Sequence, residues 1–284
     1  MPWRERKLAD GFAIELTGER IGPGLSEADR QAIYDATACH GVCVVPDQDL
    51  SDDDIFDFAC SLEDEVVIDT PLAGVPFTRV MPLGNVGPDG EILPEDNWVL
   101  SQNRANELWH VDRTFMIPRA TISMLYGKTV PPEGGNTEFC DTRLFWESLT
   151  GEEQRSLESL TCSHSLIHSR RRYGFGDWTE EALERFKPVR RPLALRQQRT
   201  GRMALALASH IHAIDGLSDE DAVALVDDLI GRATIPENVY SHKWSPGDMV
   251  LWDNRCVMHR ARPYDMATHT RDVRAIRLYD PENV

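Results

Sequence analysis

The sequence predicts a mainly β protein with flanking helices, arranged as a double-sheet jelly roll. Short stretches rich in β-branched and aromatic residues recur between turn residues, which is typical of strands. Amphipathic helices are confined to a few segments, and no repeat of solenoid or propeller period is visible. Sandwiches and barrels of about this length commonly form one domain, so we expect a single domain over 1–284.

The amino-terminal part is predicted to fold as helix, strand and helix. Ser26 opens a segment whose apolar residues recur at helical spacing up to Gly41. The apolar run 42–45 is predicted as a short buried strand. Ser51 opens a second amphipathic helix. The segment 74–106 is rich in Gly, Pro and Asp and is predicted as a long loop, and such loops tend to carry function.

The rest of the chain is predicted to be mostly strands. These strands are expected at 109–115, 122–126, 239–244, 249–252 and 273–279. Ser218 opens an amphipathic helix that ends near Gly231. The segment at about 169–200 is basic and irregular and contains proline, so we interpret it as a lid inserted over the barrel mouth. Its run of three arginines, 170–172, is interpreted as a solvated or lid-forming surface.

Composition narrows the classes of function. The formal net charge of −17 disfavours non-specific nucleic-acid binding. No stretch approaches the roughly 20 apolar residues of a membrane span, and the charged start of the chain leads into no apolar signal region, so a cytoplasmic protein is expected. The oligomeric state is left open, a homo-oligomer included. The cysteines form no CxxC pair and are expected to be free thiols: Cys39, Cys43, Cys60, Cys140, Cys162 and Cys256.

His110 and Asp112 are the first candidates for metal ligands. They lie two residues apart in a predicted strand, where side chains at i and i+2 point to the same face. An imidazole and a carboxylate presented in this way supply two adjacent ligands. One further histidine would complete the facial set of two histidines and one carboxylate, which leaves three positions of an iron ion open. The HxD motif alone is weak evidence, because it arises often by chance.

A second cluster strengthens this hypothesis. His259 lies 147 residues after Asp112 (259 − 112), on the predicted strand that follows the motif WDNR at 252–255. Asp253 and Asn254 fall at a turn and are interpreted as structural. Together with LWHVDRTF at 108–115 and GGNTEF at 134–139, this cluster resembles the successive motifs of the TauD/TfdA family of Fe(II)/2-oxoglutarate-dependent dioxygenases. The resemblance is closest to the 2,4-dichlorophenoxyacetate dioxygenase-like branch.

The resemblance implies a double-stranded β-helix (jelly roll, cupin-like) and Fe(II) held by His110, Asp112 and His259. It also implies that 2-oxoglutarate and O₂ are consumed to hydroxylate a small organic substrate, with release of succinate and CO₂. A hydroxyl placed on the carbon next to an ether oxygen would cleave the ether. Because iron halogenases of related type leave the carboxylate position empty, Asp112 argues against halogenation.

The far carboxylate of 2-oxoglutarate needs a cation, and a guanidinium is the natural choice. The resemblance places Arg271 there, with one extra residue after His259, and Arg274 is the alternative. Thr137 matches the family threonine that helps to hold this carboxylate, and Trp252 is interpreted as a wall of the metal pocket or as a core residue. Two rival functions stay open: a non-catalytic metal-binding jelly roll, and a zinc hydrolase with the same ligands. A 2-oxoglutarate clamp weighs against the first rival.

The substrate is where the sequence departs from its branch. Asn106 matches a position that touches substrate in some relatives. In the phenoxyacetate-degrading enzymes an arginine and a histidine are thought to bind the substrate carboxylate, and Ala275 and Ala213 stand at these positions here. Candidates for a replacement cation are Arg274, Arg277, His210, His212 and Arg104. We therefore expect phenoxyacetates to be poor substrates, and the preferred substrate to be larger and anchored elsewhere, or neutral and apolar at that end.

Overall fold

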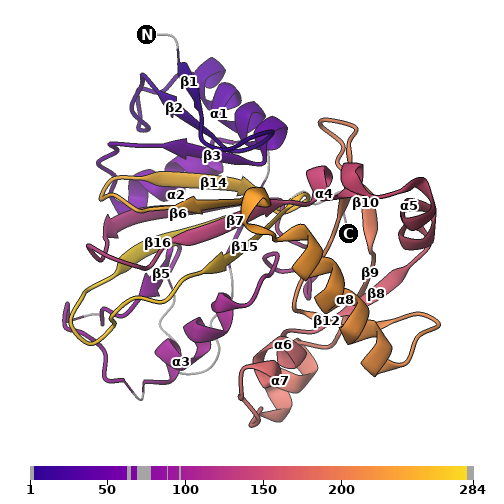
Figure 1. Cartoon of the computed structure of the whole chain (residues 1–284). Helices are drawn as coiled ribbons and strands as arrows, with labels where there is room; N and C mark the ends of the chain where they lie inside the picture. Colours follow the sequence, from indigo (N-terminus) through magenta and orange to yellow (C-terminus); the bar gives the residue numbers. More distant parts are fainter. Residues whose placement is uncertain (1–2, 63–64, 69–77, 88, 96, 280–284) are drawn as a thin grey trace.

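An antiparallel sheet, with one parallel pair at β2 and β3, forms the main layer of the computed structural model (Figure 1), which describes residues 3–62, 65–68, 78–87, 89–95 and 97–279. Its strand order is β1-β2-β3-β14-β6-β16-β4, and β5 also pairs with β16. The bounds are β1 (Arg4–Lys7), β2 (Ile14–Thr17), β3 (Val42–Val45), β4 (Glu65–Val67), β5 (Met81–Gly84), β6 (Ile122–Thr129), β14 (Met249–Asp253) and β16 (Asp272–Tyr279).

A smaller sheet faces the main one. It consists of β13 (Val239–His242), β7 (Thr137–Asp141) and β15 (Val257–Ala261) in that order. Val250 and Trp252 of the main sheet pack with Phe139 and Val257 of the smaller one in a shared apolar core. Two sheets that pack face to face in this way form a jelly roll. The predicted fold class is therefore confirmed.

Helices cover the other face of the main sheet. Because strand residues alternate between faces, Cys43 and Leu251 point away from the smaller sheet, into a second core with residues of α1 (Glu27–His40) and α2 (Asp52–Cys60). The side chains of Ser26 and Ser51 accept hydrogen bonds from the third backbone N–H of each helix, at 3.1 Å. Both predicted helices and the strand at 42–45 are confirmed.

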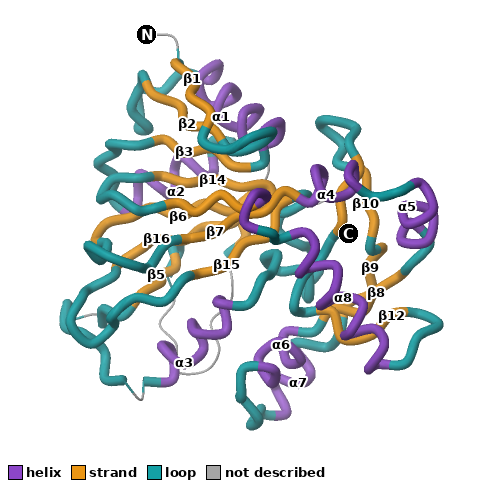
Figure 2. The backbone as a smooth tube through the Cα atoms, viewed as in Figure 1, coloured by secondary structure: helices purple, strands orange, loops and turns teal. Residues whose placement is uncertain are grey.

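A second group of short strands and helices lies at the right of Figure 2, away from the amino-terminal strands. Val226 and Leu229 share an apolar cluster with Ile211 and with Met258 of β15, so this group is continuous with the smaller sheet. The helix predicted from Ser218 is confirmed as α8. The elements are α4 (Thr142–Ser148), α5 (Gly151–Glu158), β8 (Thr161–His164), α6 (Leu166–Arg172), α7 (Glu180–Arg185), β9 (Val189–Pro192), β10 (Ala194–Arg196), β11 (Met203–Leu205), β12 (Ile211–Ile214), α8 (Asp219–Ala233) and the short helix Pro236–Asn238.

The segment 169–200 is more regular than predicted. Its second half forms β9 and β10, and Leu193 and Gln197 are fully buried, so the expectation of an irregular insertion is wrong there. The prediction took its basic residues as a sign of irregular structure. Two of them have fixed partners instead. Arg190 pairs with Asp215 on the surface, and the Nε of Arg191 donates to a backbone carbonyl at 2.8 Å.

Two further sequence predictions need correction. The strand at 109–115 is wrong: His110 forms a single isolated bridge with His259, and the chain then turns, with Arg113 at a φ of +55°. The loop predicted at 74–106 contains β5, α3 (Trp98–Arg104) and the start of the 3₁₀ helix η1 (Ala105–Glu107). Its positions 74–77, 88 and 96 lie outside the described residues. The strand predicted at 239–244 ends at His242, and the other three strand predictions are confirmed.

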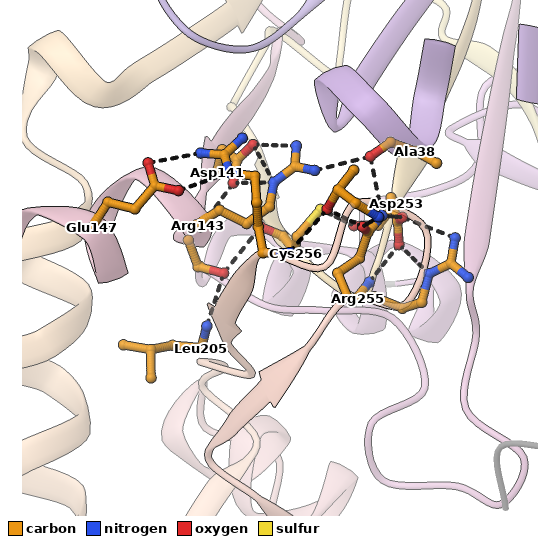
Figure 3. A network of polar contacts seen from close by, with 12 residues as sticks. Ala38, Asp141, Arg143, Glu147, Leu205, Asp253, Arg255 and Cys256 are labelled. Carbon is orange, nitrogen blue, oxygen red and sulfur yellow. Dashed lines mark hydrogen bonds and ion pairs between the residues drawn. The ribbon is translucent and has the colours of Figure 1, made fainter. Parts of the chain in front are cut away.

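Buried ion pairs hold the turn between β14 and β15 (Figure 3). The Nε of Arg255 donates to Asp253 at 2.8 Å, which confirms the structural interpretation of Asp253. Arg143 and Asp141 pair nearby with fully buried side chains, and Arg143 also donates to the carbonyl of Ala38 in α1 at 2.9 Å. These contacts connect the helical layer to both sheets. Removing one partner of such a pair would leave an uncompensated buried charge.

The six cysteines are all free thiols, as predicted. No helix in the described part of the chain is both long and apolar enough to cross a membrane. The single domain, the cytoplasmic location, the lack of nucleic-acid binding and the oligomeric state stay predictions.

Candidate active site

A cavity of about 1030 Å³ opens between the two sheets and helix α6. His110, Asp112 and His259 line it, and each residue is between 6% and 8% exposed. Their candidate ligand atoms all lie within 4.8 Å of one another. The structure therefore brings together the three residues that the sequence singled out, although His259 lies 147 residues after Asp112 (259 − 112).

The backbone arranges these residues differently from the predicted strand. The backbone N–H groups of His110 and His259 each donate to the carbonyl of the other residue, at 3.0 and 2.8 Å. This bridge places the two imidazole rings 4.2 Å apart between centroids. Asp112 then enters the cavity through the turn after the bridge, where Arg113 adopts the left-handed region.

The carboxylate of Asp112 is held in place by neighbours on the main sheet. Its Oδ2 accepts a hydrogen bond from Ser123 at 2.7 Å and lies 3.0 Å from Nε of Arg277. Asn254 donates to Ser123 at 2.7 Å and accepts from the backbone N–H of Asp112 at 3.2 Å. Burial alone raises the pKa of Asp112, but the charge and hydrogen bond of Arg277 act against burial, and this pKa lies below its usual range. Asp112 is therefore ionised and could serve as a metal ligand.

Both histidines are neutral, as metal ligation requires. Burial lowers the pKa of His110 and holds that of His259 well below its usual range. Nδ1 of His110 lies 2.7 Å from the carbonyl oxygen of Leu108, so this nitrogen carries the proton and Nε2 keeps its lone pair. Two neutral imidazoles and one carboxylate are the donor set of a non-haem Fe(II) site. The residues present therefore fit this metal.

Arg271 offers a buried cation on the same cavity. Its backbone N–H donates to Asn85 at 2.8 Å, while its Nε has no hydrogen-bond partner among the described residues. Burial lowers the pKa of the Arg271 guanidinium. A Cβ added to Gly84 would lie 1.7 Å from the carbonyl oxygen of Arg271, so only glycine allows this close packing. A buried cation with an unused donor is suited to a carboxylate ligand.

Two hydroxyl groups also line this cavity. Thr137 accepts a hydrogen bond from the indole of Trp244 at 3.0 Å, which leaves its own proton free to donate. The hydroxyl of Tyr264 is buried without a partner among the described residues. Burial raises the pKa of Tyr264 to about 12 against the opposing effect of Arg271, so the phenol stays a donor. Sequence reasoning missed Tyr264, and no motif marks it.

Trp252 forms part of the wall beside the metal ligands. Its ring lies 4.6 Å from that of His259, and its Nε1 donates to Asn254 at 3.1 Å. Trp252 therefore contributes both to the apolar core and to the cavity, and both interpretations of this residue hold.

Arg274 does not lie in the cavity, so its interpretation as a 2-oxoglutarate or substrate residue is wrong. Because residues alternate along β16, Val273 and Ala275 face the core and the cavity, whereas Arg274 points to the other side. There its Nε donates to Asp52 at 3.0 Å, and its Nη1 pairs with Asp272.

The other substrate candidates have mixed outcomes. Asn106 and His210 line the cavity, but burial holds the pKa of His210 well below its usual range, so His210 is no cation. Arg104 lies at the exposed edge, 3.7 Å from Glu95. His212 is not among the residues that line the cavity.

Arg170 lines the cavity, which agrees with the lid-forming interpretation of the basic run and not with the solvated one. Its Nη2 donates to Oδ1 of Asn106 at 3.1 Å. Three consecutive arginines do not by themselves indicate which one faces the cavity. Leu166 and Arg170 are four residues apart and share the face of α6 that lines the cavity. This spacing is the signal that could have found it.

The comparisons with known proteins agree with this geometry. The model of the family described as "Taurine catabolism dioxygenase TauD, TfdA family" matches residues 6–279. The chain is 38% identical to a 2,4-dichlorophenoxyacetate dioxygenase of Cupriavidus pinatubonensis, over 72% of this chain and 71% of that protein. It is 31% identical to an (S)-phenoxypropionate dioxygenase of Sphingobium herbicidovorans, over 90% and 88%.

A solved structure extends the likeness to the whole fold. AAD-2 in complex with Mn(II) and N-oxalylglycine has a TM-score of 0.90 and 34% identity, covering 100% of this chain and 99% of that one. The fold and the cavity thus define a jelly-roll dioxygenase that uses Fe(II), 2-oxoglutarate and O₂. More narrowly, the chain belongs to the TauD/TfdA family.

Proposed function

We propose that this dioxygenase hydroxylates a small organic acid, with Fe(II) held by His110, Asp112 and His259. The observation that carries the proposal is that two neutral imidazoles, an ionised carboxylate and the buried guanidinium of Arg271 line one cavity. A zinc hydrolase or a bare metal cage has no use for this second cation.

Bound Fe(II) supplies the chemistry that couples the oxidation of 2-oxoglutarate by O₂ to hydroxylation of the substrate. The protein positions the reactants. Arg271 and the hydroxyls of Thr137 and Tyr264 receive the far carboxylate of 2-oxoglutarate, because all three line the cavity and each has a donor that the described residues leave unused. Arg277 and Ser123 orient Asp112, and Trp252 keeps water from the metal.

The substrate class follows from the relatives and from one departure. The proteins named above act on 2,4-dichlorophenoxyacetate and (S)-phenoxypropionate, which are aryloxy acids. Hydroxylation next to the ether oxygen of such an acid would release a phenol. Ala275 lines the cavity where the phenoxyacetate-degrading branch has an arginine, so phenoxyacetate is expected to be a poor substrate.

Helices α6 and α7 are proposed to form the lid over this cavity. Leu166, Arg170 and Arg185 line it. Ile167, Ala182 and Phe186 hold the two helices together in a small apolar cluster. Lids of this kind shield the reaction from water once the substrate is bound.

The proposed function is tested by adding Fe(II) and then 2-oxoglutarate without oxygen and recording the visible spectrum. A weak charge-transfer band is expected with Fe(II), and none with Zn(II). His259→Ala should lose both the band and the release of succinate. A His259→Ala protein with a normal band and near wild-type turnover would overturn the metal assignment.

A further inference from the structure

The cavity is basic although the chain is acidic. Among the residues that the structure describes, seven arginines and four Asp or Glu residues line it, whereas the whole chain has 30 Lys and Arg against 47 Asp and Glu. Such a local reversal of charge concentrates anions at the cavity. Three of these arginines are already close to carboxylates: Arg104 to Glu95, Arg262 to Glu138 and Arg277 to Asp112.

Arg170 differs from these three. Its guanidinium donates to the neutral amide of Asn106, and the described residues offer it no ion pair. Burial lowers the pKa of Arg170 to about 10, and the more distant charge of Asp112 is the one that opposes this effect. A buried cation is costly unless an anion compensates it. Arg170 is thus a partly buried cation that lines the cavity and has no ion pair among the described residues.

The position of Arg170 suits a substrate rather than 2-oxoglutarate. His210 lies against the ring of His110, 5.9 Å between centroids, and its Nδ1 is 2.8 Å from the hydroxyl of Ser169, the residue before Arg170. Arg170 is therefore close to the metal ligands. It lies on α6, whereas Arg271 precedes β16 on the strand-built side.

We propose that Arg170, with Asn106 beside it, binds the carboxylate of the primary substrate, and that this substrate carries an aromatic or branched apolar body. This inference rests on the proposed function. Arg170 supplies from α6 the cation that Ala275 does not supply from β16. A guanidinium matches a planar carboxylate through two parallel hydrogen bonds. Phe115, Leu166 and Phe186 line the cavity with Arg170 and offer an apolar surface to the body of the substrate.

The test measures binding to the anaerobic enzyme loaded with Fe(II) and 2-oxoglutarate. The probes are phenoxyacetate, 4-phenoxybutanoate and 3-phenylpropanoate, each beside its primary amide. Binding is followed by the shift of the charge-transfer band and by calorimetry. For at least one pair, the wild type is expected to bind the acid about 30-fold or more tightly than the amide, as for a desolvated charge pair.

Three variants locate this preference. Arg170→Gln should bind acid and amide alike and should keep the band and the affinity for 2-oxoglutarate. Arg171→Gln is the matched control, because Arg171 is exposed on the same helix and does not line the cavity. It should behave as the wild type. Asn106→Asp should also lose the acid preference, because the new carboxylate would pair with Arg170.

The outcomes separate the two proposals. A wild type without the band would overturn the proposed function, and this inference with it. A normal band with acids and amides bound equally by the wild type would overturn the inference alone. So would an Arg170→Gln protein that weakens acid and amide by the same factor, or one that loses 2-oxoglutarate instead.

Discussion

The two sides of the cavity are built differently. The strand side, with β6, β7, β15 and β16, carries Ser123, Thr137, His259 and Arg277, and the two apolar cores of the main sheet support it. The helix side consists of α6 and α7, which are seven and six residues long and share a cluster of three buried residues. The residues proposed to hold iron and 2-oxoglutarate lie on or next to the strand side, and the proposed substrate cation lies on the helix side.

This difference bears on how such enzymes change specificity. Metal ligands and clamp residues tolerate little displacement, so they are best held on or next to strands with deep cores. Regions with few buried contacts have a lower free energy of local unfolding, and they tolerate sequence changes more readily. The helix side is joined to the metal ligands through His210, whose carbonyl accepts from Ser165 at 2.7 Å. Substrate selection can therefore vary on α6 while the oxidising chemistry stays the same.

The largest effect is expected for His110→Ala on the strand side. Turnover should fall to background because one ligand is lost, while the unfolding temperature stays near that of the wild type, because the core behind the site is untouched. Succinate release and thermal unfolding measure the two quantities. His40→Ala, at the end of α1, is the control and should change neither. A His110→Ala protein that does not fold would show that the ligand also supports the strand side.

Arg271→Ala should raise the KM for 2-oxoglutarate strongly. Losing a buried charge-assisted contact costs about 2–5 kcal/mol, which corresponds to roughly 30-fold or more. Arg274→Ala is the matched control, since Arg274 is three residues away and pairs outside the cavity. Steady-state kinetics with varied 2-oxoglutarate measure both variants. If Arg274→Ala shows the effect and Arg271→Ala does not, the position of the clamp is wrong.

Ser123→Ala should weaken Fe(II) binding by about 10- to 100-fold, the usual cost of losing a group that orients a metal ligand. Asp112 would keep Arg277 but lose the hydrogen bond that Ser123 donates at 2.7 Å. Ser163→Ala, on β8 outside the cavity, should leave the affinity unchanged. Titration with Fe(II) without oxygen measures the affinity. Equal Fe(II) affinities for the two variants would mean that the hydrogen bond from Ser123 does not position Asp112.

The two sides also differed in how well the sequence predicted them. The strands of the main sheet followed from periodicity, because burial on one or both faces leaves a clear pattern. The candidate metal ligands were predicted from short motifs, because a set of two histidines and one carboxylate has few other functions. The route of Asp112 into the cavity could not be predicted, since a left-handed φ at Arg113 leaves no mark in a non-glycine residue.

The helix side was harder to predict for a physical reason. Arg170, Arg171 and Arg172 are chemically identical, and their roles depend on which face of α6 packs against the cavity. That packing depends on contacts with β12 and with apolar residues further along the chain, such as those of Ile167 with Phe186. A short helix has too few residues for its own sequence to fix this phase.

The smallest expected effect is a pH dependence confined to the helix side. His168 of α6 packs near His212 of β12, with ring centroids 5.8 Å apart, and burial lowers its pKa to about 4, helped by His212 and Arg172 against Asp227 and Asp219. The unfolded histidine has its ordinary pKa of 6.5 and binds the proton more strongly. Its contribution to stability is therefore present above pH 6.5 and is lost as the pH falls towards 4.

Hydrogen exchange over α6 and α7, measured at pH 7 and pH 5 and corrected for intrinsic rates, should show more opening at the lower pH. The strand side should change less over the same interval. His168→Gln should flatten the dependence because it removes the titrating group, whereas the control His40→Gln, at the end of α1, should not. Opening that increases equally on both sides, or that persists in His168→Gln, would show that the pH response belongs to the whole fold rather than to the helix side.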